Sequence, residues 1–382
     1  MGVQGMRFLS RVLAIVSCLS INQVWAAGSE QIAKVDRSLW GESLNSPAAF
    51  DRASRAEILV FIGLLTDTTQ LDDVHLQQQL KLKSVNRDSV NKVSNRLIQI
   101  LWKNWQAAAA KCQINEGFCP KVASSEELIR ASRQLTKTLP TTYQDWYSNS
   151  LNFHRQYTYE LMRLAALFPK VSSEIERFTD NERNGFELSD RHFLLTFDDG
   201  PTNKSGSTDV LLNQLSQTKT HAIFYVLGER LQSRLHQENA ISLAKLYQGQ
   251  CVALHGWQHQ SHAKWTNWQQ SVLDTNDLVK QTFPDEYKPL FRPPYGQRRS
   301  DSGVFFDKQS LTVALWNIDS QDWNSHISAA EAGQRVLNLM LLWRRGVILF
   351  HDIHTKAQQA VPWLINNTQQ SGIVWDDCRD YK

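Results

Sequence analysis

The sequence predicts an α/β protein in which a parallel sheet follows an all-helical region. Before about residue 168 apolar residues recur at helical spacing, whereas after about residue 190 short apolar runs alternate with helical stretches. Strands that alternate with helices indicate a parallel sheet, either open or closed into a barrel. With 382 residues, the chain is also long enough for two domains of ordinary size.

Composition points to a globular protein. Hydrophobic residues make up 42% of the chain and charged residues 21%, which suits a sizeable core. Lys and Arg number 41 against 38 Asp and Glu, a net charge of +3, and this balance argues against a general nucleic-acid or anionic-membrane binder. The 13 Trp supply either core volume or flat faces on which sugar rings stack.

Residues 1–26 have the pattern of an export signal. Arg7 and Arg11 precede the apolar run 12–21, and small residues lead to a cleavage site after Ala26. The run is shorter than the ~20 residues that span a bilayer as a helix. We therefore expect an exported protein, in the periplasm first of all, with secretion as the alternative.

The five cysteines bear on anchoring and on disulfides. The residues just before Cys18 resemble a lipobox, so a lipid attached to Cys18 is the alternative to ordinary signal cleavage. The other four are an even number, which favours disulfides in an oxidising compartment, and four buried free thiols are the alternative. The expected pairs are Cys112 with Cys119, which are close in sequence, and Cys251 with Cys378.

Residues 27–185 are expected to form a helical accessory domain. Ser46 and Pro47 supply an N-cap and a first-turn proline, and Ser124 opens a capping-box pattern. The expected helices begin at Pro47, at Val90, at Ser125 and at Tyr143, and the last ends at Leu167. No cluster of catalytic residue types stands out here. Support of the following domain is the default role, with substrate positioning or partner contact as alternatives.

Residues 186–382 are expected to form the second domain, with buried strands separated by helices. The expected strands are 193–197, 222–226, 252–254, 311–316 and 347–350. In parallel sheets and barrels the reactive groups gather at the carboxyl ends of the strands. The residues that follow each strand are therefore the candidates for chemistry.

The first of these strands ends in Asp198 and Asp199, followed by a Gly-Pro turn. Successive side chains point to opposite sides of a strand, so one carboxylate can bind a metal while the other handles a proton. A solvated Asp-Asp-Gly turn is the alternative.

Two imidazoles, His255 and His259, follow the strand 252–254. Four residues apart, they can face one ion, and with one carboxylate they supply the three protein ligands of an open zinc site. His262 lies three residues further on and is expected outside this set of ligands.

Three further polar clusters follow at expected strand ends. They are Arg292-Pro-Pro-Tyr295, Asp319-Ser-Gln-Asp322-Trp323 and Leu349-Phe-His351-Asp352. Each has an alternative as a proline turn, an acidic loop or a core histidine. Five such coincidences in sequence order favour one shared site.

Together these clusters resemble the five motifs of the polysaccharide deacetylase family, the NodB-homology carbohydrate esterases. The resemblance covers roughly residues 190–355 and does not reach the helical half. It implies a distorted (β/α) barrel of NodB-homology type, preceded by the all-α accessory domain. It also implies one divalent metal ion, with zinc expected, held by Asp199, His255 and His259.

The resemblance implies a task for each remaining side chain. Asp198 would be the general base and His351 the general acid. Arg292 would pair with Asp198, and Asp322 would pair with His351. Three residues are implied to bind substrate: Tyr295 through its backbone N–H at the oxyanion, and Trp323 and Leu349 around the acetyl methyl group.

One position departs from the family pattern. Gly256 stands where Ser or Thr usually follows the first metal-binding His. Loss of that hydroxyl is expected to loosen the loop or weaken metal binding, without changing the class of reaction.

The implied activity is that of an exported hydrolase acting on linear amide C–N bonds. It would remove N-acetyl groups from N-acetylhexosamine units of peptidoglycan, an exopolysaccharide or chitin-like oligomers. The alternatives are an O-acetyl esterase on acetylated polysaccharide and a non-catalytic glycan-binding protein on the same fold. We expect no nucleic-acid partner, and membrane contact only through the leader or a lipid on Cys18.

Overall fold

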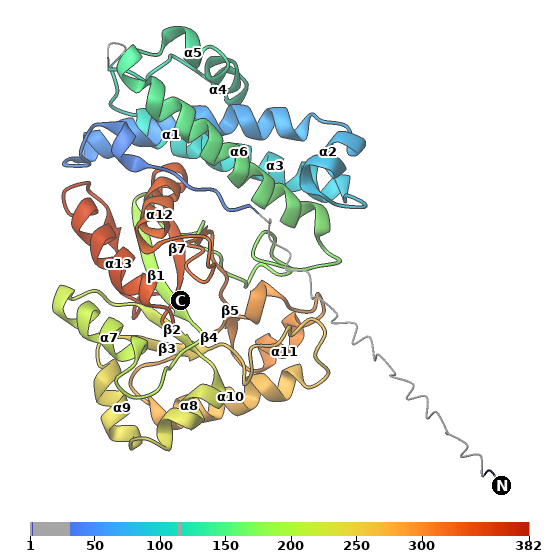
Figure 1. The fold of residues 1–382 in the computed structure, drawn as a ribbon, viewed down its shortest axis with the longest axis vertical. Helices are drawn as coiled ribbons and strands as arrows, with labels where there is room; N and C mark the ends of the chain where they lie inside the picture. The colour runs from blue at the N-terminus through green and yellow to red at the C-terminus, as the bar shows by residue number, and fades with distance from the viewer. Residues whose placement is uncertain (1, 3–30, 114–115, 382) are drawn as a thin grey trace.

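The computed structural model describes residues 2, 31–113 and 116–381. Apart from residue 2, the expected export signal lies outside the described residues, and so does Cys18. Figure 1 shows a layer of helices from the first half of the chain, stacked on a sheet and its covering helices from the second half. Among the residues described, no helix is long and apolar enough to cross a membrane.

The first half of the chain is helical. Its elements are η1 (Arg37–Trp40), α1 (Pro47–Thr69), α2 (Asp73–Leu80), α3 (Arg87–Ala109), α4 (Ser125–Ser132), α5 (Leu135–Thr138), η2 (Thr141–Tyr143) and α6 (Gln144–Leu167). The expected cap forms, because the Ser46 side chain accepts a hydrogen bond from the backbone N–H of Ala49. α3 begins before the predicted start at Val90, since Asn86 caps it.

The second half forms one parallel sheet that curls into a half barrel, which confirms the predicted fold class. Its strands are β1 (His192–Asp198), β2 (Ile223–Val226), β3 (Cys251–Leu254), β4 (Tyr287–Phe291), β5 (Thr312–Val313), β6 (Ile318–Asp319), β7 (Gly346–His351) and β8 (Val374–Trp375). The order is β5-β4-β3-β2-β1-β7-β6, and β8 pairs with β1 outside this path. In the β1–β7 pair, Asp198 lies opposite His351.

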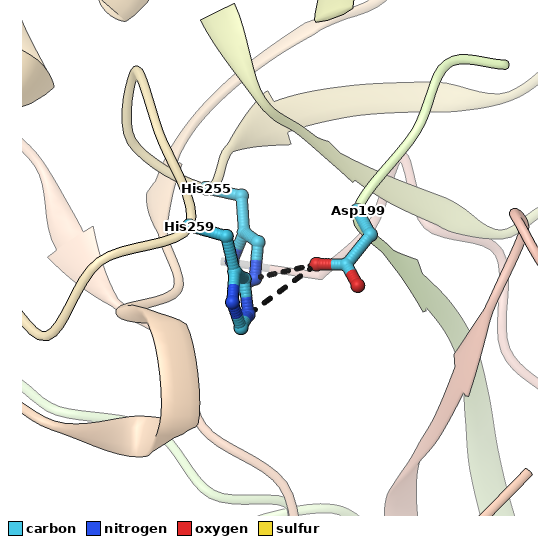
Figure 2. A group of neighbouring side chains, drawn as sticks. All are labelled: Asp199, His255 and His259. Atoms are coloured by element: carbon cyan, nitrogen blue, oxygen red, sulfur yellow. Dashed lines mark ion pairs between the residues drawn. The ribbon is translucent and has the colours of Figure 1, made fainter. Parts of the chain in front are cut away.

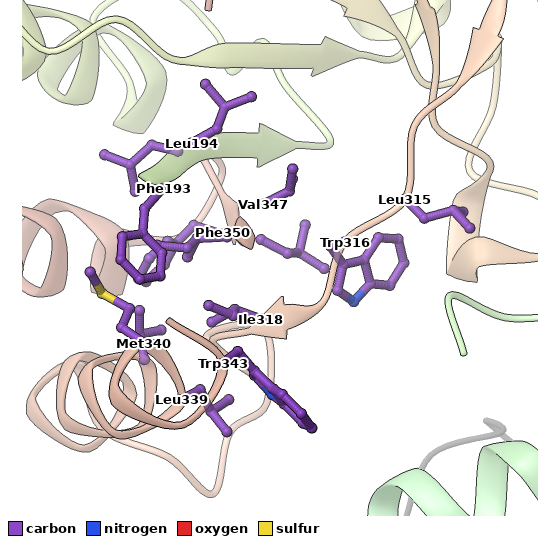
Figure 3. Packing of buried hydrophobic residues seen from close by; sticks show 14 of the residues in the cluster. Phe193, Leu194, Leu315, Trp316, Ile318, Leu339, Met340, Trp343, Val347 and Phe350 are labelled. Carbon is purple, nitrogen blue, oxygen red and sulfur yellow. The ribbon is translucent and has the colours of Figure 1, made fainter. Parts of the chain in front are cut away.

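The remaining elements lie between these strands. They are α7 (Ser207–Thr218), α8 (Gly228–Leu235), α9 (Ala240–Tyr247), α10 (Trp268–Thr282), η3 (Pro294–Gly296), α11 (Gly303–Lys308), α12 (Ala329–Trp343) and α13 (Thr355–Thr368). α12 lies between the sheet and the helical layer, since it contacts β6 and β7 as well as α1 and α3 (Figure 1). Figure 3 shows the apolar packing there, with Phe193 and Phe350 of the sheet near Leu339 and Met340 of α12.

Three strands were not predicted from the sequence, and one was predicted too long. β4 is half polar and partly exposed, while β6 and β8 have two residues each, so none of them has a continuous apolar run. The strand predicted over 311–316 is reduced to β5. Ala314 instead forms a bridge with Arg183 in the segment that leads from the helical half.

Buried polar contacts join the helical layer to α12. Glu57 of α1 is fully buried, and it accepts hydrogen bonds from the side chains of Arg37, Trp146, Ser150, His154 and Asn338. Arg335 of α12 pairs with Glu160 of α6 at 2.6 Å and donates to the carbonyl oxygen of Asp319 at the end of β6. Through Arg335, the helical layer is therefore joined to the end of β6, where the polar cluster that begins at Asp319 lies.

Both expected disulfides are present in the structure. Cys112 bonds to Cys119 after α3, and Cys251 bonds to Cys378. The second bond joins the start of β3 to the segment after β8, and it holds the C-terminal segment against the sheet.

Candidate active site

The five clusters identified in the sequence meet at one cavity of about 400 Å³. Eight of the ten predicted site residues line it: Asp198, Asp199, His255, His259, Tyr295, Trp323, Leu349 and His351. The other two, Arg292 and Asp322, lie behind this lining and contact it through Asp198 and His351. The strands carry these groups to one place because β1, β3, β4, β6 and β7 run parallel and end at the same edge of the sheet.

The turn after β1 is shaped by close packing. A Cβ on Gly200 would lie 2.0 Å from the Asp352 carboxylate, so only glycine fits between the end of β1 and the end of β7. The Asp352 carboxylate accepts a hydrogen bond from the Thr208 hydroxyl. The backbone N–H of Asp352 donates to the carbonyl oxygen of Asp198. The two ends of β1 and β7 are thereby held in fixed relation.

Asp199, His255 and His259 form a group that can hold a metal ion (Figure 2). The Oδ1 atom of Asp199 lies 3.3 Å from Nε2 of His255 and 3.5 Å from Nε2 of His259. Tetrahedral zinc with bonds of roughly 2.0–2.1 Å places its ligand atoms about 3.3 Å apart, so these separations fit such an ion. The same Oδ1 atom is buried and accepts no hydrogen bond, which leaves it available as a ligand.

The protonation of this group also suits a cation. Burial alone would raise the pKa of Asp199, but the close contact with His255 and the nearby His351 hold that pKa below its usual range. Burial and the neighbouring His255 lower the pKa of His259 to about 4, so its ring is neutral. The Nδ1 atom of His255 lies 2.8 Å from the carbonyl oxygen of Arg292, a contact that leaves Nε2 free to face the ion.

Asp198 stands beside this group and is paired with Arg292. The guanidinium donates to the Asp198 carboxylate at 2.8 Å and to the Thr196 hydroxyl at 2.7 Å. Arg292 is fully buried, and its other N–H groups donate to the carbonyl oxygens of Ala314 and Leu315. The arginine is thus fixed in place, and it holds the Asp198 carboxylate beside the metal-binding group.

His351 is paired with Asp322 at the end of β7. Nδ1 of His351 lies 2.7 Å from the Asp322 carboxylate, which also accepts the backbone N–H of His351 at 3.0 Å. Burial alone would lower the pKa of His351, but the charge and hydrogen bond of Asp322 raise it to about 10. The imidazole is therefore protonated at neutral pH, and its other nitrogen can donate a proton into the cavity.

The three predicted substrate-binding residues differ in exposure. Tyr295 and Trp323 are exposed at the mouth of the cavity, whereas Leu349 is buried. Tyr295 has φ +60°, and its ring lies 4.4 Å from the ring of His259. A left-handed backbone at a residue with a large side chain is uncommon, and here it lies next to the metal-binding group.

The structure accounts for Gly256. Its φ is +86°, and a Cβ there would lie 2.6 Å from the His262 ring and 3.1 Å from the Ser271 hydroxyl. That hydroxyl accepts the backbone N–H of Trp257 at 2.7 Å. Ser271 of α10 and the buried His262 therefore brace the loop that the sequence led us to expect to be loose, and a side chain at residue 256 would displace them.

Sequence reasoning missed one wall of the cavity. Residues of α3, α6 and the segment that joins the two halves also line it: Leu97, Tyr157, Leu161, Leu164, Glu174 and Ile175. No motif marked them, because their only shared property is their position opposite the strand ends. Trp316, just before β6, was read as part of a strand, but it also faces this cavity.

An open parallel sheet with a His-His-Asp group flanked by a paired carboxylate and a paired imidazole defines a candidate hydrolytic metal centre. Residues 187–312, within the strand-bearing half of the chain, match the family model described as "Polysaccharide deacetylase". The match ends before Asp322 and His351, which the structure nevertheless brings to the same site.

Named relatives share this half of the chain. Peptidoglycan-N-acetylmuramic acid deacetylase PdaC of Bacillus subtilis is 32% identical over 181 residues, which cover 47% of this chain and 36% of that protein. A bifunctional xylanase/xylan deacetylase of Cellvibrio japonicus is 30% identical, covering 47% and 26%. Peptidoglycan-N-acetylglucosamine deacetylase of Bacillus cereus is 28% identical, covering 56% and 78%. The chain thus spans about a third of the length of the first relative and about a quarter of the length of the second.

Proposed function

We propose that the protein is an exported, metal-dependent deacetylase that removes N-acetyl groups from N-acetylhexosamine units of a glycan. The observation that carries the proposal is the grouping of a His-His-Asp set with two charge pairs, Asp198–Arg292 and His351–Asp322, around one cavity. Two of the relatives are named as peptidoglycan deacetylases, which supports peptidoglycan as the first substrate to test.

Asp199, His255 and His259 are the residues that would hold the ion, and zinc suits two imidazoles and one carboxylate. When bound, a divalent ion of this kind lowers the pKa of water and polarises a carbonyl group. The neutral His259 ring and the hydrogen-bond-free Oδ1 atom of Asp199 are both in the form that ligation requires.

The protein's own groups divide the proton transfers between two sides of the cavity. Asp198, which accepts a hydrogen bond from Arg292, would accept the proton of the attacking water. The backbone N–H of Tyr295 would donate to the oxygen that becomes negatively charged. His351, kept protonated by Asp322, would give its proton to the departing amine.

An O-acetyl esterase is the second candidate, and the similarity to a xylan deacetylase favours it. An alkoxide leaves more readily than an amine and needs less help from an acid. The strongly stabilised charge on His351 therefore favours the amide over the ester.

The test is acetate release by the zinc-loaded chain from peptidoglycan, from N-acetylglucosamine oligomers and from acetylated xylan. We expect release from an N-acetylated glycan and a loss of about a hundredfold or more in Asp198→Asn. Release from xylan alone would establish the esterase instead. Zinc binding without release from any substrate would leave a glycan-binding role.

A further inference from the structure

The cavity at the metal-binding group continues to the helical layer. On one side it is lined by Asp199, His259 and Tyr295, and on the other by Leu97 of α3 and by Leu161 of α6. The helical layer therefore faces the reacting centre directly. A glycan that places an acetyl group near Asp199 has its neighbouring units next to this second wall.

Two polar groups in the cavity have no side-chain partner among the described residues. The indole N–H of Trp316 is buried, with 6% of the residue exposed, and it donates to no acceptor. Glu174 lines the same cavity, and in residues 31–113 and 116–381 its carboxyl group contacts its own backbone N–H and no other side chain. A buried donor without an acceptor is destabilising, so its persistence beside a cavity points to an acceptor on a ligand.

The other charged groups of this wall are already paired. Glu160 pairs with Arg335 at 2.6 Å, and Arg96 pairs with Glu176 at 2.5 Å. Because these charges are neutralised within the protein, the wall offers no charge to an anionic ligand. What it does offer is hydrogen-bonding groups between apolar surfaces, which is the chemistry that a neutral sugar requires.

Glu174 is held firmly in relation to Tyr295. Arg298 is buried and donates to the carbonyl oxygens of Ser173 and Gly296, which joins the segment carrying Glu174 to the turn after Tyr295. Gly296 permits this contact, since a Cβ there would lie 3.0 Å from the backbone nitrogen of Glu174. A preorganised hydrogen-bonding group of this kind loses little entropy on binding.

We propose that the helical wall forms a binding site for a second sugar unit, in which Glu174 and the indole N–H of Trp316 hydrogen-bond to hydroxyl groups of the unit next to the acetylated one. This rests on the proposed function for the identity of the reacting unit. The aliphatic side chains of α6, Leu161 and Leu164, cover the apolar face of that sugar. The helical half is accordingly a substrate-binding part of the protein.

The protonation of Glu174 suits this task. Burial raises its pKa to about 8, and the nearby Asp319 acts in the same direction. At neutral pH the group is therefore mainly a carboxylic acid, which both donates and accepts hydrogen bonds, as sugar hydroxyls do.

The test measures binding separately from turnover. Isothermal titration calorimetry with the full-length, zinc-loaded Asp198→Asn protein compares the N-acetylglucosamine monomer with its tetramer. We expect the tetramer to bind more tightly, and Glu174→Leu to raise its Kd about five- to tenfold. Glu174→Gln keeps a donor and an acceptor and should retain most of the affinity. Trp316→Phe keeps an aromatic ring, although a smaller one, loses the indole N–H and should weaken tetramer binding.

The matched control is Glu229→Leu, at an exposed position of α8 on the opposite side of the molecule from the helical layer (Figure 1). Equal affinity for monomer and tetramer would overturn the proposal. So would an unchanged tetramer Kd in Glu174→Leu, or affinity that follows the length of the N-acyl chain instead of the number of sugars. Failure of acetate release with these binding results intact would count against the proposed function alone.

Discussion

The sheet and the helical layer use buried charge in different ways. At the strand ends, Asp199 keeps a buried oxygen without a hydrogen bond, and His259 is neutral and open to the cavity. In the helical layer, Glu57 receives five side-chain hydrogen bonds, and Glu160 is paired with Arg335. Polar groups that lack hydrogen-bond partners next to a cavity indicate binding and chemistry. Buried charges with a full set of partners instead hold the two halves of the molecule together.

The largest effect is expected when a residue of the metal-binding group is replaced. His259→Ala removes one of three protein ligands, so we expect zinc affinity to fall by roughly a hundredfold or more and acetate release to be lost. Competition with a chromophoric chelator measures the affinity. The exposed His236 at the end of α8 supplies the control, His236→Ala. Unchanged zinc binding in His259→Ala would show that the ion is held elsewhere.

Glu57→Gln tests the helical layer, in which the buried charges have hydrogen-bond partners. It leaves Arg37 and His154 buried beside a weaker acceptor, so the free energy of unfolding should fall by about 3 kcal/mol in urea titrations. Hydrogen bonds from His154 and the charge of Arg37 outweigh the effect of burial and lower the pKa of Glu57 to about 2. Its stabilisation is therefore present above its usual pKa near 4.5 and is lost as the pH falls toward 2.

A change below about 0.5 kcal/mol in Glu57→Gln, as expected for an exposed residue, would contradict the role given to this network. The control Glu229→Gln should stay within that limit. The kcat of the folded Glu57→Gln protein should match the wild type, since Glu57 does not line the active-site cavity.

Asp322→Asn tests the proton donor, His351, independently of the metal-binding group. Asp322 raises the pKa of His351, so its removal should lower that pKa. Activity that needs protonated His351 is lost as the pH rises through its pKa. The alkaline limb of the kcat profile should therefore move to lower pH, with about a tenfold loss at pH 8. An alkaline limb that stays in place would assign the proton to another group.

The smallest effect is expected at the loop of the metal-binding histidines. Gly256→Ala forces a side chain into a left-handed backbone and against His262, at a cost of about 1–2 kcal/mol in unfolding free energy. Gly117→Ala is the control, since a Cβ there meets nothing within 4 Å. Equal stability of the two variants would show that the loop yields easily.

The strand ends could be predicted from the sequence, and the wall opposite them could not. Asp198, His255 and His351 each follow an apolar run, and the topology of a parallel sheet brings such positions together. Glu174 and Leu161 belong to no motif, because a wall is defined by packing between distant segments. β6 was missed because it has two residues, although Asp322 beyond it was recognised.

The central claim is tested most directly by mass spectrometry of an N-acetylglucosamine pentamer after incubation with the zinc-loaded chain. We predict oligomers that have lost acetyl groups and carry free amines, formed by the wild type and not by Asp198→Asn. An unchanged pentamer, with zinc bound stoichiometrically and the protein folded, would contradict the assignment of N-deacetylation to this site.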